Sequence, residues 1–246
     1  MEIASSVALS RMIAQQRALE LSAANIANAT TPGYRAQRLQ FSDWLVRERG
    51  QPDGGGTVAY AQAPGTWRDP RTGPVTHSGN PLDLAIGANG FFTVQTPGGP
   101  RLTRAGHFEL SPTGNIVDTA GNALLNDIGQ PLQLSTSDTT ITVGGDGTVS
   151  SENGQIGKIG VVAPASEDSL VAEGDLLLNT GAPTQPVAAP KITQGAIEES
   201  DVQPVVELTR MLDGEKTFQF LAQFLQAEGD RQQAAIDKIG PARTNS

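Results

Sequence analysis

Two rows of side chains with the same seven-residue spacing lie at opposite ends of this 246-residue chain. The N-terminal row recurs at steps of three and four, through Leu9, Met12, Gln16, Leu19, Ala23 and Ile26. This spacing places them on one side of an α-helix, and members seven apart form a narrow seam that needs a partner. We predict a helix over residues 1–33, ended by Pro32, which lacks an N–H, and by Gly33, which permits positive φ.

The partner row lies near the C-terminus. Ser200 or Asp201, followed by Pro204, is typical of a helix start, so we predict a second helix within residues 201–246. Its apolar side contains Leu208, Met211, Phe218 and Leu225. Gly214 and Gly229 each weaken a helix by roughly 1 kcal/mol relative to alanine, so this helix relies on packing. The pattern leaves two interpretations open: a coiled coil between the two ends, or packing of both helices on a central domain.

Between the two ends the pattern changes to short strands. Residues 34–80 are expected to be an extended linker with a Gly-rich stretch at 50–57. Residues 81–200 show apolar alternation with turn signals such as Pro112–Asn115 and Gly144–Gly147, which predicts an antiparallel β domain. The expected fold class is therefore mainly β with α-helical termini, in which the β domain is inserted between two helices that pair.

Composition excludes several classes of function. The chain has no cysteine and two histidines, so a thiolate or histidine metal site is not expected. His77 and His107 lack a nearby nucleophile motif and are interpreted as structural or surface residues. A net charge of −9 argues against nucleic acid or an anionic membrane as partner. We expect no catalytic residue, cofactor or metal, and the protein is not expected to be an enzyme.

The N-terminus carries no pattern of a cleaved signal peptide, and no apolar run approaches the roughly 18–20 residues of a membrane span. Two locations remain open at this point: the cytoplasm, or export by a route that reads an uncleaved N-terminal segment.

Asn25 and Asn28 lie three residues apart near the end of the predicted N-terminal helix. They could cap the helix and form a turn, or their amides could pair across subunits and fix the register of a coiled coil. Both interpretations stay open on the residues alone.

Three segments, taken in order, resemble the flagellar axial proteins, the family of rod and hook subunits. The first runs from Ala24 through Thr31, Pro32, Gly33 and Tyr34. The second combines Asn80–Ile86, Gly90–Val94 and Leu102–Phe108, and the third runs from Ser200 to Phe218. Asp201, Lys216 and Gln219 stand where this family usually has Asn, Arg and Glu.

The resemblance implies a structural subunit of the bacterial flagellar rod. It implies that the terminal helices polymerise into a helical tube that spans the periplasm and transmits torque. The implied partners are copies of the chain, other axial proteins and the flagellar type III export apparatus. Chain length fits the proximal and the distal rod members of the family alike, whereas the Thr31-Pro32-Gly33 motif and the compact β region favour the proximal members.

One alternative from another class is a β module that binds glycan or peptidoglycan, carried on a helical stalk. Such a module is expected to present a shallow groove lined by aromatic side chains, and only 4% of the residues are aromatic.

In the rod interpretation, the narrow apolar seams of the two helices bury too little surface to make them stable in a single chain. The ends of the free chain are therefore expected to fold when subunits assemble.

Overall fold

A computed structural model describes residues 2–47, 57–69, 71–87, 89–135, 138, 140–166, 170–174 and 176–239. The chain forms two compact units. The first, which we call the helical unit, comprises residues 1–27, 37–68 and 203–246. The second, the β unit, comprises residues 28–36 and 69–202. The expected fold class is confirmed, because helices at both ends flank a region of antiparallel strands.

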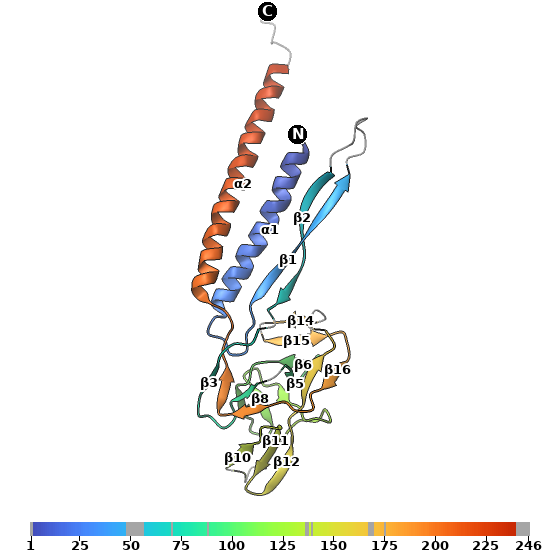
Figure 1. The fold of residues 1–246 in the computed structure, drawn as a ribbon, viewed down its shortest axis with the longest axis vertical. Helices are drawn as coiled ribbons and strands as arrows, with labels where there is room; N and C mark the ends of the chain where they lie inside the picture. Colours follow the sequence, from blue (N-terminus) through green and yellow to red (C-terminus); the bar gives the residue numbers. More distant parts are fainter. Residues whose placement is uncertain are drawn as a thin grey trace, which may run out of the picture. The chain divides into compact units, whose positions relative to one another are not determined.

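The helical unit consists of two long helices and a hairpin. Helix α1 spans Glu2–Ala27 and α2 spans Pro204–Ile239. Strands β1, Gln37–Arg47, and β2, Thr57–Arg68, pair antiparallel with one register shift between Gln40 and Ser42. Helix α1 packs against α2 on one side and against the hairpin on another, so it lies between them (Figure 1). Pairing of the two terminal helices within the chain is thus confirmed.

The end of α1 differs from the prediction. The helix stops at Ala27, so Pro32 and Gly33 lie beyond it and belong to the β unit. Asn28 begins a turn in which the Thr31 N–H donates to the Asn28 carbonyl at 3.1 Å. The Thr31 hydroxyl also donates to the Asn28 side chain at 3.1 Å. Asparagine and threonine side chains that bond locally compete with helical bonding, which explains the earlier end.

Residues 34–80, expected to be a linker, contain the β1–β2 hairpin and strand β3, Val75–His77. The alternation in this range is loose, so the sequence gives little sign of regular pairing. Most of the Gly-rich stretch, residues 50–56, lies outside the described residues.

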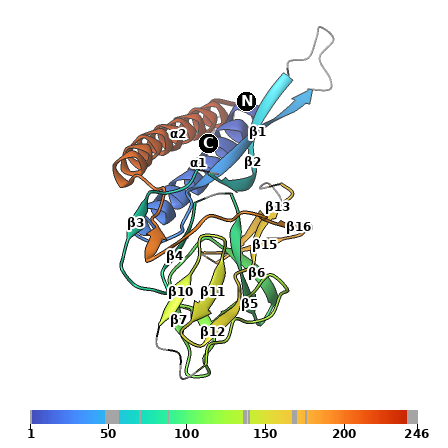
Figure 2. The ribbon, with the colours of Figure 1, turned by 60° about the horizontal axis from the view of Figure 1, so that its bottom comes forward.

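The β unit is built from short antiparallel strands (Figure 2). Its central sheet has the order β14-β15-β6-β5-β9-β8-β7, and β13 pairs with both β5 and β16. Strands β10, β11 and β12 form a separate sheet, and β17 pairs with β4 and β18 with β3. The strands are β4 Leu84–Ile86, β5 Phe91–Thr96, β6 Gly99–Thr103, β7 Phe108–Leu110, β8 Ile116–Asp118, β9 Ala123–Leu124, β10 Ile141–Val143, β11 Thr148–Ser151, β12 Gly154–Lys158, β13 Val161–Pro164, β14 Leu170–Glu173, β15 Leu177–Thr180, β16 Thr184–Pro186, β17 Ile192–Gln194 and β18 Ala196–Glu198.

The main core of the β unit lies on one face of the central sheet. Phe92 and Phe108 are fully buried and meet edge to face, with ring centroids 5.4 Å apart and planes at 88°. Such aromatic pairs stabilise beyond the area that they bury. Phe91, Leu102 and Leu178 form a smaller cluster. Their neighbours along β5 and β6, Phe92 and Thr103, point to the opposite face, because successive residues of a strand alternate.

Candidate functional site: the helix seam and the motif cluster

One seam runs along α2 within the helical unit. Its buried and half-buried residues follow each other at steps of four and three: Glu207, Met211, Gly214, Phe218, Leu221, Leu225, Glu228 and Gln232. This is the heptad spacing of a coiled-coil seam. Three predicted residues, Met211, Phe218 and Leu225, therefore lie on it. Leu208 does not, because it is one position off the row and 47% exposed.

The predicted residues of α1 divide in the same way. Met12, Leu19 and Ile26 are half-buried, whereas Leu9 is exposed. Ala8 and Ala14 are the apolar residues that α1 buries most completely among those described. The helix uses small side chains at its covered positions because it has neighbours on two sides. Met12, Leu19 and Ile26 therefore lie on the covered side of α1 and Leu9 does not, and a role of these residues in contacts between subunits stays a prediction.

Gly214 allows the two helices to approach closely. A Cβ atom at this position would lie 2.6 Å from Gln15 Nε2 and 2.9 Å from Leu19 Cδ2. By contrast, a Cβ at Gly229 would meet nothing within 4 Å. The two glycines that looked equivalent in the sequence thus have different roles, and only Gly214 serves the packing of α1 on α2.

A buried polar cluster lies where α2 begins. Glu207 is 1% exposed, and its Oε1 accepts hydrogen bonds from Arg38 at 2.7 Å and from Arg210 at 2.6 Å. Its Oε2 accepts a hydrogen bond from Asn25 at 3.4 Å. Burial on its own would raise the pKa of Glu207, but the hydrogen bond and charge of Arg38, with Asn25 and Arg210, bring it below its usual value. Glu207 therefore remains an ionised carboxylate at neutral pH.

Asn25 connects this cluster to the hairpin. Its Nδ2 donates to the Gln37 carbonyl and its Oδ1 accepts from the Gln37 N–H, both at 2.9 Å. The amide thereby acts as a strand partner for the first residue of β1. Asn28 accepts a bond from Thr31 within the turn of the β unit. These contacts lie within one chain, and pairing of the two asparagines across subunits stays a prediction.

In the β unit, the turn of the first sequence motif packs on the second motif. Gly33 has φ +72°, and a Cβ there would lie 2.4 Å from the backbone nitrogen of Ala105 and 2.5 Å from the carbonyl carbon of Arg104. Only glycine fits such a position. The Gly33 N–H donates to the Glu198 carbonyl at 2.7 Å. Thr31 and Pro32 are half-buried beside it, and Tyr34 is buried in a small cluster with Val202.

A buried ion pair joins the second motif to the strand before the third. Arg104 donates to Glu198 at 2.8 Å, and both side chains are 2% exposed. Arg104 also donates to the Ile86 carbonyl, and the Gly73 N–H donates to Glu198. The guanidiniums of Arg104 and Arg35 lie 5.3 and 5.4 Å from the ring centre of Phe91. This ion pair was not predicted from the sequence. The feature that could have indicated it is the position of Arg104 directly after Leu102 and Thr103, which are both buried.

Asp201 connects the third motif to the first. Its Oδ1 accepts the Ala36 N–H at 2.6 Å, and its own N–H donates to the Tyr34 carbonyl at 3.3 Å. Oδ2 is buried and has no hydrogen-bond partner among the described residues. Burial raises the pKa of Asp201 above its usual value, against the hydrogen bond from Ala36 that lowers it. The three motifs of the sequence therefore meet in one cluster of the β unit.

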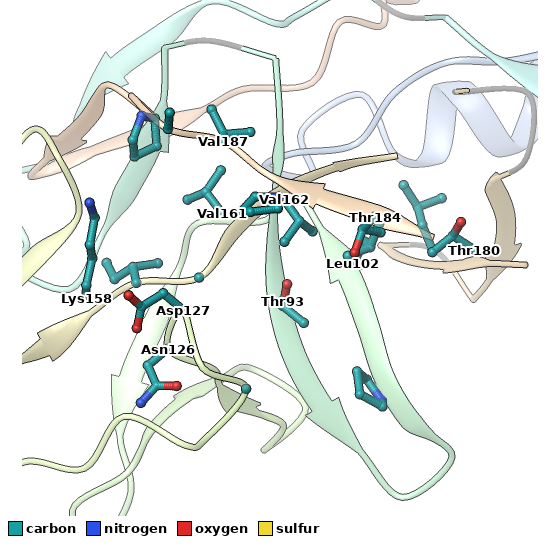
Figure 3. A pocket seen from close by; sticks show the side chains of 18 of the residues that line it. Thr93, Leu102, Asn126, Asp127, Lys158, Val161, Val162, Thr180, Thr184 and Val187 are labelled. Carbon is teal, nitrogen blue, oxygen red and sulfur yellow. The ribbon is translucent and has the colours of Figure 1, made fainter. Parts of the chain in front are cut away.

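A cavity of about 380 Å³ lies on the face of the central sheet that carries Leu102 and Leu178, opposite the main core (Figure 3). Thr93, Leu102 and Leu178 line it from neighbouring strands, on which they lie directly opposite one another. Asp127 and Lys158 are the ionisable residues among those that line it, and none of the lining residues is aromatic. The cavity thus lacks the aromatic surface that the glycan-binding alternative requires.

His107 lies near two carboxylates. Its Nδ1 is 2.6 Å from Asp83 Oδ1 and its Nε2 is 3.8 Å from Glu109 Oε1, so it has acidic neighbours at a position that was interpreted as structural or on the surface. Within the described ranges, no group of three His, Cys, Asp or Glu side chains could hold a metal ion. Neither helix, over its described residues, is long and apolar enough to cross a membrane.

Three family models of known proteins match parts of this chain. One, described as flagella basal body rod protein, matches residues 6–35. A second, flagellar hook protein FlgE/F/G D1 domain, matches residues 85–151. The third, flagellar basal body rod FlgEFG protein C-terminal, matches residues 193–238. The matched ranges contain the seam of α1, much of the β unit and the seam of α2.

Curated relatives resemble the chain over its whole length. It is 34% identical to the flagellar basal-body rod protein FlgF of Caulobacter vibrioides, over 98% of this chain and 99% of that protein. FlgF of Mesorhizobium japonicum is 31% identical, over 95% and 96% of the two chains. The flagellar basal-body rod protein FlgG of Bacillus subtilis is also 31% identical, over 83% and 86%.

Proposed function

The chain belongs to the family of flagellar basal-body rod proteins, and on that premise we propose that it is a structural subunit that polymerises through its terminal helices. The observation that carries this proposal is the helical unit itself. Its seam pairs α1 with α2, yet large apolar side chains remain exposed on both helices. They are Leu9 and Ile13 on α1, and Val205, Val206, Leu208, Leu212, Phe220, Phe224 and Ile236 on α2.

Exposed apolar side chains along two helices favour burial against further helices. Each fully buried Leu, Ile or Phe side chain stabilises by roughly 1.5–3 kcal/mol relative to an exposed one. Contacts between unlike surfaces of identical subunits generate open helical filaments. Repeated packing of the helical units thus forms the tube of the rod, and the tube transmits torque along its axis.

Folding of the helical unit is coupled to this assembly. The seam of α2 carries Glu207, Gly214, Glu228 and Gln232 among its apolar residues, so it buries little apolar surface within one chain. Hydrogen exchange on the free subunit is expected to show slow exchange in the β unit and fast exchange in the helices. Equal protection of both units would contradict the coupling.

The remaining features follow from family membership. In this proposal the chain leaves the cell's interior through the flagellar type III export apparatus, and the assembled rod spans the periplasm. Its partners are copies of itself and the other axial proteins. We assign it to the FlgF type, supported by similarity to FlgF proteins over nearly the full chain. The FlgG type is the alternative.

The test is motility of a strain that carries only a variant of this chain. Phe218→Asp places a charge on the α2 seam and is expected to abolish swimming. The matched control is Gln219→Asp, which adds the same charge at the adjacent exposed position. Swimming at the normal rate with Phe218→Asp, at normal protein level, would overturn assembly through the paired helices.

A further inference from the structure

A groove with an excess of positive charge runs along the helical unit. Its cavity of about 320 Å³ is lined by residues of three elements, including Gln15, Ala18 and Ser22 from α1, Arg38 and Leu39 from β1, and Arg210 from α2. The floor is a row of α1 at steps of three and four that begins at Gln15 and ends at Asn25. Most side chains of this row are short or uncharged, so the groove has space above α1 for part of another molecule.

The charge of the groove is not balanced by its own residues. Arg38 and Arg210 share a single carboxylate, because both donate to Oε1 of Glu207. Two guanidiniums with one carboxylate leave one positive charge in the groove. Each arginine uses only Nη1 in its contact with Glu207, whereas a guanidinium carries five N–H donors. Further donors are therefore available for an anionic group.

Accessibility distinguishes the two arginines. The Arg38 side chain is 22% exposed and Glu207 is buried, so this pair belongs to the interior of the unit. The Arg210 side chain is 49% exposed and reaches the cavity from the surface of α2. Arg210 can thus contact a second molecule while Arg38 keeps Glu207 neutralised.

We propose that this groove binds a carboxylate side chain from a second copy of the chain. The proposal rests on the proposed assembly and names one of its contacts. Guanidinium matches carboxylate in geometry and charge, and the bond strengthens where water is partly excluded. The β unit of the second copy supplies acidic side chains for this contact. The β unit carries 15 acidic and 6 basic residues, whereas the helical unit carries 11 of each.

The first experiment measures self-association of the full chain by analytical ultracentrifugation. Arg210→Gln is expected to weaken association about tenfold, which corresponds to about 1.4 kcal/mol. Lys216→Gln removes one positive charge from a more exposed position of the same helix and is the matched control, expected to leave association unchanged. Equal association of Arg210→Gln and the unaltered chain would overturn the proposal and leave the proposed function intact. Helical circular dichroism checks that both variants fold.

The second experiment tests the carboxylate directly, under conditions in which circular dichroism shows that the helices are folded. Acetate is titrated into the isotope-labelled full chain at constant ionic strength, with chloride and inorganic phosphate as parallel probes. The Nε–H signals of Arg210 and Arg38 are expected to shift with acetate. Absence of any shift would overturn the proposal. Shifts with all anions together with undiminished association of Arg210→Gln would identify a site for free anions, which also overturns docking of a second copy. A chain that binds acetate but never self-associates would contradict the proposed function and this contact with it.

Discussion

The two units of this molecule differ in what they place at their centre. The β unit buries large apolar side chains such as Phe92, Phe108 and Ile116, together with the ion pair of Arg104 and Glu198. The helical unit buries a carboxylate, an amide and small residues, at Glu207, Asn25 and Gly214, and leaves Phe220 68% exposed. The β unit thus satisfies its own hydrophobic requirement within one chain. The helical unit has its polar groups satisfied inside and its apolar groups available outside, as an assembling element requires.

Net charge follows the same division. The helical unit is neutral and the β unit has a net charge of −9, so all of the chain's excess charge lies in the β unit. Like charges repel, and a net charge far from zero keeps a surface soluble. Neutral helices can therefore pack together while the charge of the β units opposes nonspecific association. The following changes test whether stability and assembly separate along this line.

The largest effect is expected in the core of the β unit. Phe92→Ala should lower its free energy of unfolding by about 3–5 kcal/mol, because the fully buried ring leaves a cavity and Phe108 loses its partner. Native-state hydrogen exchange of β-unit amides measures the loss. Leu110→Ala, at an exposed position of β7, is the control. Equal loss of protection in the helices would contradict the separation of the two units.

The next effect concerns the buried carboxylate of the helical unit. Glu207→Gln removes the charge that Arg38 and Arg210 share and should destabilise the unit by about 2 kcal/mol. Since the folded pKa of Glu207 is lowered, its stabilisation is present above the unfolded pKa and is lost as pH falls through the folded pKa. Thermal unfolding followed at the helical signal should therefore show a smaller acid dependence in the variant. The same acid dependence in both proteins would rule out this role.

The two glycines of α2 give a smaller, paired test. Gly229→Ala has open space and should stabilise the helix by about 1 kcal/mol. Gly214→Ala offers the same gain in helix propensity but requires Gln15 and Leu19 to move, so its net gain should be close to zero or negative. Helical content and urea unfolding measure both variants. An equal gain in stability at both positions would show that the close approach of the two helices at Gly214 does not contribute to stability.

The smallest effect is expected at Asp201, whose Oδ2 is buried and has no hydrogen-bond partner among the described residues. The folded pKa of Asp201 is raised, so its favourable contribution is present below the unfolded pKa and lost as pH rises through the folded pKa. Asp201→Asn should therefore stabilise the β unit by under about 1 kcal/mol at pH 7, with the gain fading in acid. Urea unfolding at pH 7 and pH 4 provides the measurement. A variant that is less stable than the unaltered chain at pH 7 would contradict this account.

Residue patterns predicted that the two terminal helices pair, but they did not predict every residue of the seam or the end of α1. Met211 and Phe218 could be placed on a seam because helical spacing depends on local geometry. Leu208 could not be excluded, since its exposure depends on where α1 lies. Helix α1 was predicted to end at Pro32, but the local bonds of Asn28 and Thr31 ended it earlier. The hairpin at β1 and β2 was missed because strand pairing is a contact between distant residues that loose alternation does not specify.

By itself, the sequence determined the order of elements, the heptad rows, the concentration of acid in the middle and the family. These follow from spacing, composition and motif, which need no knowledge of contacts. Only the tertiary structure decided that Gly33 must approach Arg104, that Glu207 is held by Arg38 and Asn25, and that Gly214 differs from Gly229. Each of these depends on residues far apart in the chain meeting at van der Waals or hydrogen-bond distance, and such meetings are properties of the fold.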